Sequence, residues 1–477
     1  MLPVSELRSV RRAVLVALLC VVVAGGALRG LAASDPGAYQ SADEIAYAKI
    51  ARTLADRLVY GDPGMKDPVH WPPGAPVLFA AAYELYPKQR GYGEWDVPAA
   101  YPVQAAVGTA VIPAAFLLAM VVAGPLAGLG AATLVAFYPP LIDASRDLLS
   151  EPLGALLLTC ALLAVALALR RPAWWRFVVA GALLGATILT RADLILVPLL
   201  AGAVAAVALG RSAEEGGRGP ALRGVGALAA GCLVLVAPWT WYASNQAQTL
   251  VPVSSGGASN AFVGTFLPGE GSMFGAKRAL AEEVARRFPR YAGEPAFRIP
   301  QTHVIDTVAA RRPDLPPDEA LRAETRANLE RYALGEPLTF AGMMLAKVER
   351  LWLHYTTGTY GQERSWIRAL HVTIVALAFA GLAAAAARRR GGPVLWLIGL
   401  VLLYVTALNA VLISEARHNL AVMPLVAVAV AAGVSLALGG RQARASASGR
   451  SPSGSRAAAA RSRTRAAPRS GAGGDRR

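Results

Sequence analysis

Long apolar runs separated by short polar turns fill most of this chain, and they give the first expectation about its fold. A helix needs about 20 mostly apolar residues to cross a bilayer. Ten runs approach this length, although the two on either side of Thr190-Arg-Ala-Asp193 are short. The pattern predicts an all-α, polytopic membrane protein with about ten transmembrane helices, at 12–31, 99–122, 126–142, 152–169, 176–190, 192–209, 224–243, 367–387, 393–413 and 419–438.

The polar segments between the runs are unequal in length, and two of them are long enough to fold. These are residues 32–98 and 244–366, both rich in proline, glycine and aromatic residues. Apolar residues recur at helical spacing after Ser41, and again at about 275–288, 317–334 and 338–355. We therefore expect short interfacial helices in both loops. The glycine- and serine-rich stretch 252–265 is expected to be a flexible polar loop.

Composition excludes a soluble multidomain protein. Hydrophobic residues make up 55% of the 477 residues and charged residues 16%, whereas soluble domains carry about 25% charged residues. The mean hydropathy is +0.42. The three cysteines, Cys20, Cys160 and Cys232, each lie inside an apolar run, so they form neither a disulfide framework nor a zinc motif.

The positive charge is concentrated at one side of the predicted membrane. Ten arginines and one acid lie between Arg441 and Arg477, so this tail supplies +9 of the net charge of +16. We expect residues 441–477 to be a disordered cytoplasmic tail and residues 1–440 to be the membrane domain. Arginines in the short turns fall on the same side in a ten-helix scheme, which places both termini in the cytoplasm of a plasma-membrane protein. A nucleic-acid partner is not expected; membrane lipids are.

Candidate chemistry begins in the first long loop, at the start of its predicted helix. Ser41 and Glu44 have the spacing of a capping box, which explains Glu44 structurally. Asp43 lies in the first helical turn, where the helix dipole stabilises an anion. At the mouth of an apolar bundle, the same ionised carboxylate is also suited to accept a proton from a hydroxyl group.

Two short motifs in this loop resemble a known family. Asp43-Glu44-Ile-Ala-Tyr47 followed by His70-Trp-Pro-Pro-Gly74 is similar to the first outer loop of GT-C integral-membrane glycosyltransferases, in the branch of protein O-mannosyltransferases and lipid A aminoarabinose transferases. The order of the apolar runs and the two long loops match as well, over roughly residues 12–438. The resemblance implies sugar transfer on the outer face of the membrane from a polyprenyl-phosphate donor to a glycan, lipid or protein acceptor.

The resemblance also assigns roles to residues. It implies that Asp43 is the catalytic base and that Glu44 is the second member of an acidic pair. His70, in the second motif, joins the residues expected to orient the acceptor or the sugar. Trp71 beside it suits either an aromatic belt at the membrane interface or a platform on which a sugar stacks.

The turn at 143–151 carries four further charged side chains, and two interpretations of it stay open. Asp147 or Glu151 orients sugar or acceptor hydroxyl groups, as acids do in this turn of the family. Alternatively, Arg146 forms an ion pair with Asp143, Asp147 or Glu151, because charges at the edge of apolar helices need water or a partner.

A departing lipid phosphate needs cations, and arginine binds phosphate through two parallel hydrogen bonds. The candidates on the outer side are Arg191, Arg350, Arg417 and His418. Arg191 is equally suited to an ion pair with Asp193. At the position of His418, family members carry an aromatic residue after the arginine.

Together these patterns predict an inverting glycosyltransferase, because one base and one displacement suffice. The pattern assigns no cofactor and no metal ligands. A transporter or lipid flippase is the alternative, although such proteins tend to have related halves and broken helices at the membrane midplane, and the sequence has no internal repeat.

Overall fold

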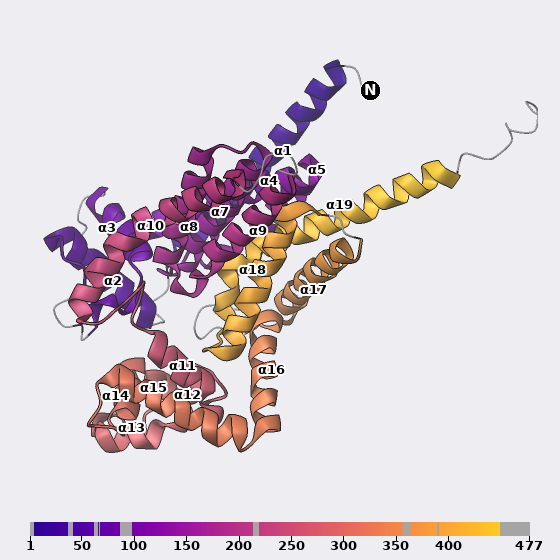
Figure 1. Cartoon of the computed structure of the whole chain (residues 1–477). Helices are drawn as coiled ribbons and strands as arrows, with labels where there is room; N and C mark the ends of the chain where they lie inside the picture. The colour runs from indigo at the N-terminus through magenta and orange to yellow at the C-terminus, as the bar shows by residue number, and fades with distance from the viewer. Residues whose placement is uncertain are drawn as a thin grey trace, which may run out of the picture. The chain divides into compact units, whose positions relative to one another are not determined.

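The protein is helical throughout the parts that the structure describes. The computed structural model describes residues 4–36, 42–61, 65, 67–85, 98–212, 219–355, 363–388 and 391–448, and no strand occurs within them. Two compact units are distinguished, Met1–Val434 and Ser435–Arg477. All helices discussed below except the end of the last one belong to the first unit (Figure 1).

Eight helical segments in the described chain are long and apolar enough to cross a membrane, which confirms the all-α, multi-pass class. Two of them begin with a 3-10 turn, at Ala192 and Ala416. The helices concerned are α1 (Val4–Ala33), α4 (Ala100–Ala123), α7 (Glu151–Arg170), α9 (Val197–Ser212), α10 (Gly219–Ala247), α17 (Ser365–Ala387), α18 (Gly392–Val411) and α19 (Met423–Ser448).

The other two expected spans are shorter helices, and prolines explain one of them. The run 126–142 is not continuous: α5 (Pro125–Phe137) ends before Pro139, and a separate turn, α6 (Pro139–Asp143), follows. Proline disfavours a helical conformation in the residue before it. The carbonyl groups left free at the end of α5 are satisfied by the buried Arg29 of α1, which donates to the oxygens of Val135 at 2.8 Å and Ala136 at 3.1 Å.

Contacts at the helix ends show that α5 runs opposite to α4 and that α8 (Trp174–Thr190) runs opposite to α7. Gln104, near the start of α4, donates to the carbonyl oxygen of Leu149 just before α7, at 2.8 Å, so α5 and α6 reverse the direction of α4. Arg191, just after α8, contacts Glu151 at the start of α7, at 3.0 Å. At the opposite end, Arg170 of α7 donates to the carbonyl of Val121 in α4. The described chain thus holds eight helices of spanning length, and the shorter apolar helices α5 and α8 connect some of them end to end.

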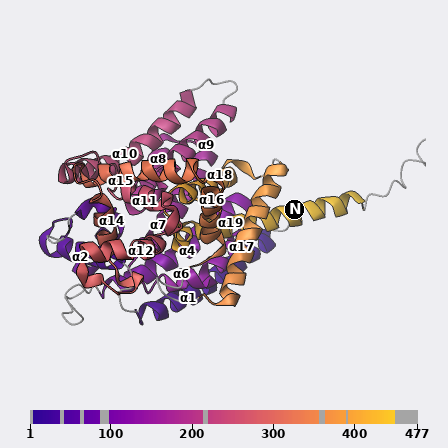
Figure 2. The ribbon, with the colours of Figure 1, turned by 90° about the horizontal axis from the view of Figure 1, so that it is seen from below.

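Glycines fix the short helix α8 in place. A Cβ atom at Gly181 would lie 1.9 Å from the carbonyl oxygen of Leu228, and one at Gly231 would lie 2.1 Å from that of Val178. Helices α8 and α10 therefore pack backbone against backbone, as small residues permit in membranes, and α9 lies beside α10 (Figure 2). At the end of α8, a Cβ atom at Gly74 would meet the side chain of Thr190 at 2.2 Å, so the first outer loop is pressed onto this end.

The first outer loop contains α2 (Ala42–Arg57), the 3-10 turn Pro68–His70 and α3 (Gly74–Leu85). The expected helix after Ser41 is confirmed, and Tyr47, Ala48, Ala51 and Phe79 bury its inner face. Ser41 itself lies outside the described residues, and with it the proposed capping box.

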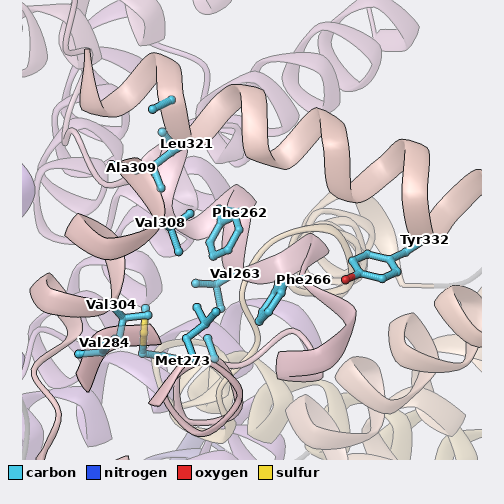
Figure 3. Packing of buried hydrophobic residues seen from close by; sticks show 14 of the residues in the cluster. Phe262, Val263, Phe266, Met273, Val284, Val304, Val308, Ala309, Leu321 and Tyr332 are labelled. Atoms are coloured by element: carbon cyan, nitrogen blue, oxygen red, sulfur yellow. The ribbon is translucent and has the colours of Figure 1, made fainter. Parts of the chain in front are cut away.

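The second outer loop is a small helical subdomain with its own core. The three expected helical patterns are confirmed, and residues 329–334 continue α15 as a π-helix. Figure 3 shows apolar side chains from separate helices meeting in the core, Phe262, Val304 and Leu321 among them. The helices are α11 (Gly257–Thr265), α12 (Met273–Ala279), α13 (Ala281–Arg287), α14 (Gln301–Ala309), α15 (Pro317–Asn328) and α16 (Pro337–Leu353).

The prediction of a flexible polar loop at 252–265 was wrong for its second half. Its second half forms α11, because Phe262 and Val263 have no exposed surface and anchor the helix in the core of the subdomain. This half is mostly polar or small, and its large apolar residues are only Phe262 and Val263, so the sequence contained little indication of a buried helix.

Helix α16 fixes the segment that joins α18 to α19. The buried amine of Lys347 donates to the carbonyl oxygens of Gly264 at 2.9 Å and Val411 at 3.3 Å. Burial lowers the pKa of this amine to about 7. Arg350 donates to the carbonyl oxygens of Glu270 at 3.2 Å and Ser414 at 3.3 Å. These bonds fasten residues 411–414 from one side.

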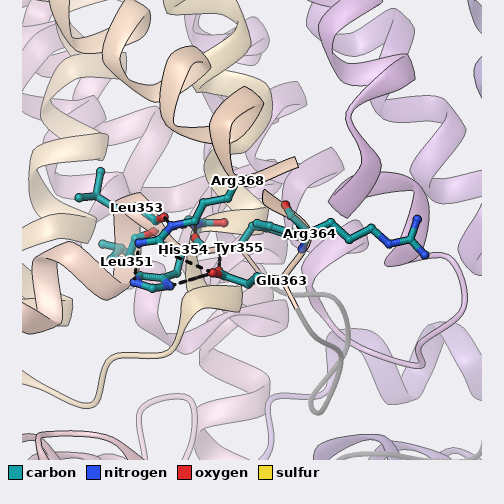
Figure 4. Close-up of polar contacts among 8 residues, drawn as sticks. Leu351, Leu353, His354, Tyr355, Glu363, Arg364 and Arg368 are labelled. Atoms are coloured by element: carbon teal, nitrogen blue, oxygen red, sulfur yellow. Dashed lines mark hydrogen bonds and ion pairs between the residues drawn. The ribbon is translucent and has the colours of Figure 1, made fainter. Parts of the chain in front are cut away.

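Residues at the end of α16 and at the start of α17 form a polar cluster. His354 lies 3.2 Å from the carboxylate of Glu363, and Arg368 donates to the carbonyl oxygen of Leu353 at 3.1 Å (Figure 4). The ring of His354 is thus held between the charged side chains of Glu363 and Arg368.

The boundary of the expected disordered tail is also corrected. Helix α19 continues through Arg441 to Ser448. Alanine, arginine and glutamine in this stretch are good helix formers and extend the preceding helix. Residues 449–477 lie outside the described residues.

Candidate active site

A cavity of about 210 Å³ opens where the ends of several helices meet. Its lining comes from both outer loops, from the start of α7, from the α8–α9 junction and from the α18–α19 junction. Six of the nine residues that the sequence singled out lie on its wall: Asp43, His70, Glu151, Arg191, Arg417 and His418.

Asp43 is held by two donors across this cavity. The indole nitrogen of Trp71 donates to its Oδ1 at 3.0 Å, and the guanidinium of Arg417 contacts its Oδ2. Burial raises the pKa of Asp43, but the charge of Arg417 and the two hydrogen bonds outweigh it and hold the pKa at about 2. The carboxylate is a quarter exposed and stays ionised. Trp71 thus contacts the candidate base itself, a role that neither sequence interpretation included.

Arg191 lies between two carboxylates. Its guanidinium donates to both oxygens of Asp193, at 3.0 and 2.8 Å, and contacts Glu151 Oε1 at 3.0 Å. The side chains of Arg191 and Glu151 are 8% and 4% exposed. The ion pair with Asp193 is therefore present, and it is extended to Glu151. The second oxygen of Glu151 is buried and has no hydrogen-bond partner among the described residues.

Glu44 and Asp147 lie beside the cavity and do not line it. Glu44 is buried and accepts a hydrogen bond from the amide of Leu148 at 3.3 Å. Burial and the negative charges of Glu44, Glu151 and Asp143 raise the pKa of Asp147 to about 7.

Arg146 does not form the expected ion pair with an acid of the turn 143–151. Its guanidinium contacts Asp35, at the end of the first span, at 2.9 Å. The sequence did not indicate this partner, because it lies 111 positions away.

The α18–α19 junction supplies Glu415, Arg417 and His418 to the cavity wall. His418 Nδ1 lies 2.7 Å from Asn409 Oδ1, and Glu415 accepts from the amide of Met273 at 3.2 Å. Burial raises the pKa of Glu415. Arg350, expected to bind donor phosphate, is not among the lining residues and contacts carbonyl groups.

His70 connects the two outer loops. Its Nδ1 lies 3.7 Å from Asp67, and the hydroxyl of Ser255 donates to the same carboxylate. A Cβ atom at Gly256 would lie 2.9 Å from the ring, so glycine is required for this approach.

Lys277 of α12 is a cation near the site that the sequence interpretation missed. It is half-buried and is not among the residues that line the cavity. Burial lowers its pKa, while Glu415 and Asp43 act in the opposite direction. Its only signal in the sequence is its place on a helix of the second outer loop. Among the described residues, no group of three or more His, Cys, Asp or Glu side chains is arranged to hold a metal ion.

Solved structures of other proteins share this fold. No protein-family model and no curated protein matches the chain. The oligosaccharyltransferase AglB from Archaeoglobus fulgidus, in complex with an inhibitory peptide and a dolichol-phosphate, matches with a TM-score of 0.53 and 15% identity over 90% of this chain and 50% of AglB. The apo form of the Archaeoglobus fulgidus enzyme matches with a TM-score of 0.54 and 16% identity over 89% of this chain and 50% of that chain.

A weaker match is ArnT from Cupriavidus metallidurans bound to undecaprenyl phosphate, with a TM-score of 0.39 and 18% identity over 83% of this chain and 76% of ArnT. The chain spans about half the length of the oligosaccharyltransferases. At these identities the similarity concerns the fold alone, which this chain shares with the Archaeoglobus fulgidus oligosaccharyltransferases.

Proposed function

We propose that this GT-C-like protein transfers a sugar from a polyprenyl-phosphate donor to an acceptor hydroxyl outside the cytoplasm. The observation that carries the proposal is the ionised Asp43 on the cavity wall, with Arg417 in contact. A base and a cation for a phosphate leaving group are what such a transfer requires. The dolichol-phosphate in AglB, which has this fold, favours a lipid-phosphate donor.

The reaction is a single displacement with inversion. The acceptor oxygen attacks the anomeric carbon and gives its proton to Asp43. The bond between that carbon and the phosphate oxygen breaks, and the phosphate takes the electron pair. Arg417 stabilises the charge that develops there. Glu44 acts from behind Asp43, by holding the turn before α7.

The remaining polar residues position the substrates. His70 and the Glu151–Arg191–Asp193 group are placed to orient hydroxyl groups of sugar or acceptor, and His418 borders the phosphate site. Arg350 acts indirectly, because it fastens Ser414, which lies three residues before Arg417. The catalytic unit is residues 1–440, and the basic tail 441–477 remains in the cytoplasm.

The cavity faces away from the cytoplasm in this proposal. Arg170, Arg171, Arg211 and Arg388 lie at the helix ends opposite the cavity, as the positive-inside rule requires of the cytoplasmic side. Reporter domains fused at residues 300 and 450 should respond from opposite sides of the membrane. Responses from the same side would contradict the orientation and the accessible face of the site.

Cleavage of the sugar–phosphate bond of the donor would distinguish a glycosyltransferase from a transporter. Purified protein would be incubated with a panel of polyprenyl-phosphate hexoses and pentoses and with membrane extract as the acceptor source. We expect one donor to release polyprenyl phosphate, measured by mass spectrometry. A transporter or flippase leaves every donor intact, and intact donors across the panel would refute the proposed activity.

A further inference from the structure

Both oxygens of the candidate base are already occupied in the substrate-free protein. Trp71 binds one and Arg417 the other. A carboxylate that accepts charge-assisted hydrogen bonds is a weak base, because donors that favour its ionised form also disfavour protonation. The arrangement explains how Asp43 stays charged, and it raises the question of how Asp43 gains enough basicity to take a proton.

Burial raises the pKa of Asp43, and among the groups that lower this pKa Arg417 has the largest effect. Trp71 and His70 from the first outer loop also lower the pKa of Asp43. The other charged or titratable groups that interact with Asp43 are Tyr47 on its own helix, Lys277 on α12, and Glu415 and His418 at the α18–α19 junction. Since Arg417 is the only guanidinium among them, its position sets how strongly Asp43 holds a proton.

Arg417 can serve a second ligand without leaving its place on the wall. In the described contacts only Nη2 is used, so Nε and Nη1 have no partner. Its side chain is 26% exposed and faces the cavity. A guanidinium has five N–H donors and prefers two parallel bonds to a phosphate.

We propose that Arg417 moves its hydrogen bond from Asp43 to the donor phosphate, so that Asp43 becomes a competent base only when the donor is bound. This inference rests on the proposed function. As the phosphate neutralises the guanidinium, the pKa of Asp43 rises from about 2 toward the ordinary aspartate value of about 3.9. The acceptor proton then passes to the freed Asp43 oxygen as the sugar–phosphate bond breaks. The leaving phosphate keeps Arg417 until it departs, after which the Asp43–Arg417 pair forms again.

The test is chemical labelling of Asp43 with dicyclohexylcarbodiimide, which modifies protonated carboxyl groups. Purified full-length protein would be labelled between pH 5 and 7, alone, with polyprenyl phosphate, and with the matching polyprenol, and the Asp43 peptide quantified by mass spectrometry. We expect polyprenyl phosphate to raise labelling by at least about tenfold, which is one pKa unit, and polyprenol to have no effect. Arg417→Gln should show the same rise without lipid.

Two controls separate the causes. Arg278→Gln removes an exposed guanidinium that pairs with Glu270 and does not contact Asp43, so its labelling should match the wild type. Polyprenyl phosphate added to Arg417→Gln, at a concentration at which native mass spectrometry shows the lipid bound, measures how far bound lipid shields Asp43 from the reagent. Lipid binding is followed in the same samples by native mass spectrometry.

The outcomes are distinct. Bound polyprenyl phosphate with unchanged, shielding-corrected labelling overturns the exchange of Arg417 and leaves the proposed donor standing. Absence of bound polyprenyl phosphate overturns the proposed donor and the exchange together. Unchanged labelling of Arg417→Gln overturns the premise that Arg417 controls Asp43.

Discussion

Replacing Asp43 with asparagine should lower the rate of sugar transfer by about 10²–10⁴-fold, the usual contribution of a general base. Asparagine keeps the size of the side chain and can still accept the hydrogen bond from Trp71, but it cannot take the acceptor proton. Expression, insertion and donor binding should be preserved. The measurement is the release of polyprenyl phosphate by the purified variant, with folding checked by size-exclusion chromatography.

Glu44→Gln is the matched control, because it changes the neighbouring carboxylate in the same helical turn. Its amide oxygen can still accept from the amide of Leu148, so its loss of rate should be much smaller. Transfer by Asp43→Asn at the wild-type rate would mean that Asp43 only holds Arg417 in place. The base would then have to be sought at Glu151 or Asp147.

Replacing Arg191 with methionine should destabilise the protein by about 3–5 kcal/mol, the typical cost of removing one partner from a buried ion pair. Methionine fills similar space but leaves Glu151 and Asp193 without their shared cation. Thermal unfolding in detergent, followed by tryptophan fluorescence, would measure the effect. This prediction treats Arg191 as a residue that builds the site.

The triple variant Arg191→Met, Glu151→Gln and Asp193→Asn tests the cause. With all three charges removed, no carboxylate is left unpaired, and much of the lost stability should return. If Arg191→Met instead unfolds at the wild-type temperature and loses affinity for polyprenyl phosphate, Arg191 is a donor ligand and not a structural cation.

Prediction from sequence succeeded where the determining interactions are local. Runs of about 20 apolar residues specify membrane helices because each must satisfy its backbone hydrogen bonds internally. The prediction of one continuous helix at 126–142 was wrong, because Pro139 divides the run. The prediction of a loop at 257–265 was also wrong, because the buried Phe262 and Val263 stabilise a helix there. In the second case the deciding contacts come from other helices of the subdomain, which no local pattern contains.

The candidate site divides in the same way. The sequence by itself determined which residue types stand at the outer helix ends, so Asp43, Glu151 and Arg417 were found as charges that an apolar bundle must expose or pair. Only the tertiary structure decided their partners: Arg417 reaches Asp43 across 374 positions, and Arg146 reaches Asp35 across 111. The pairing of buried charges depends on distances of a few ångströms between helices that are remote in sequence, and packing of the whole bundle sets those distances.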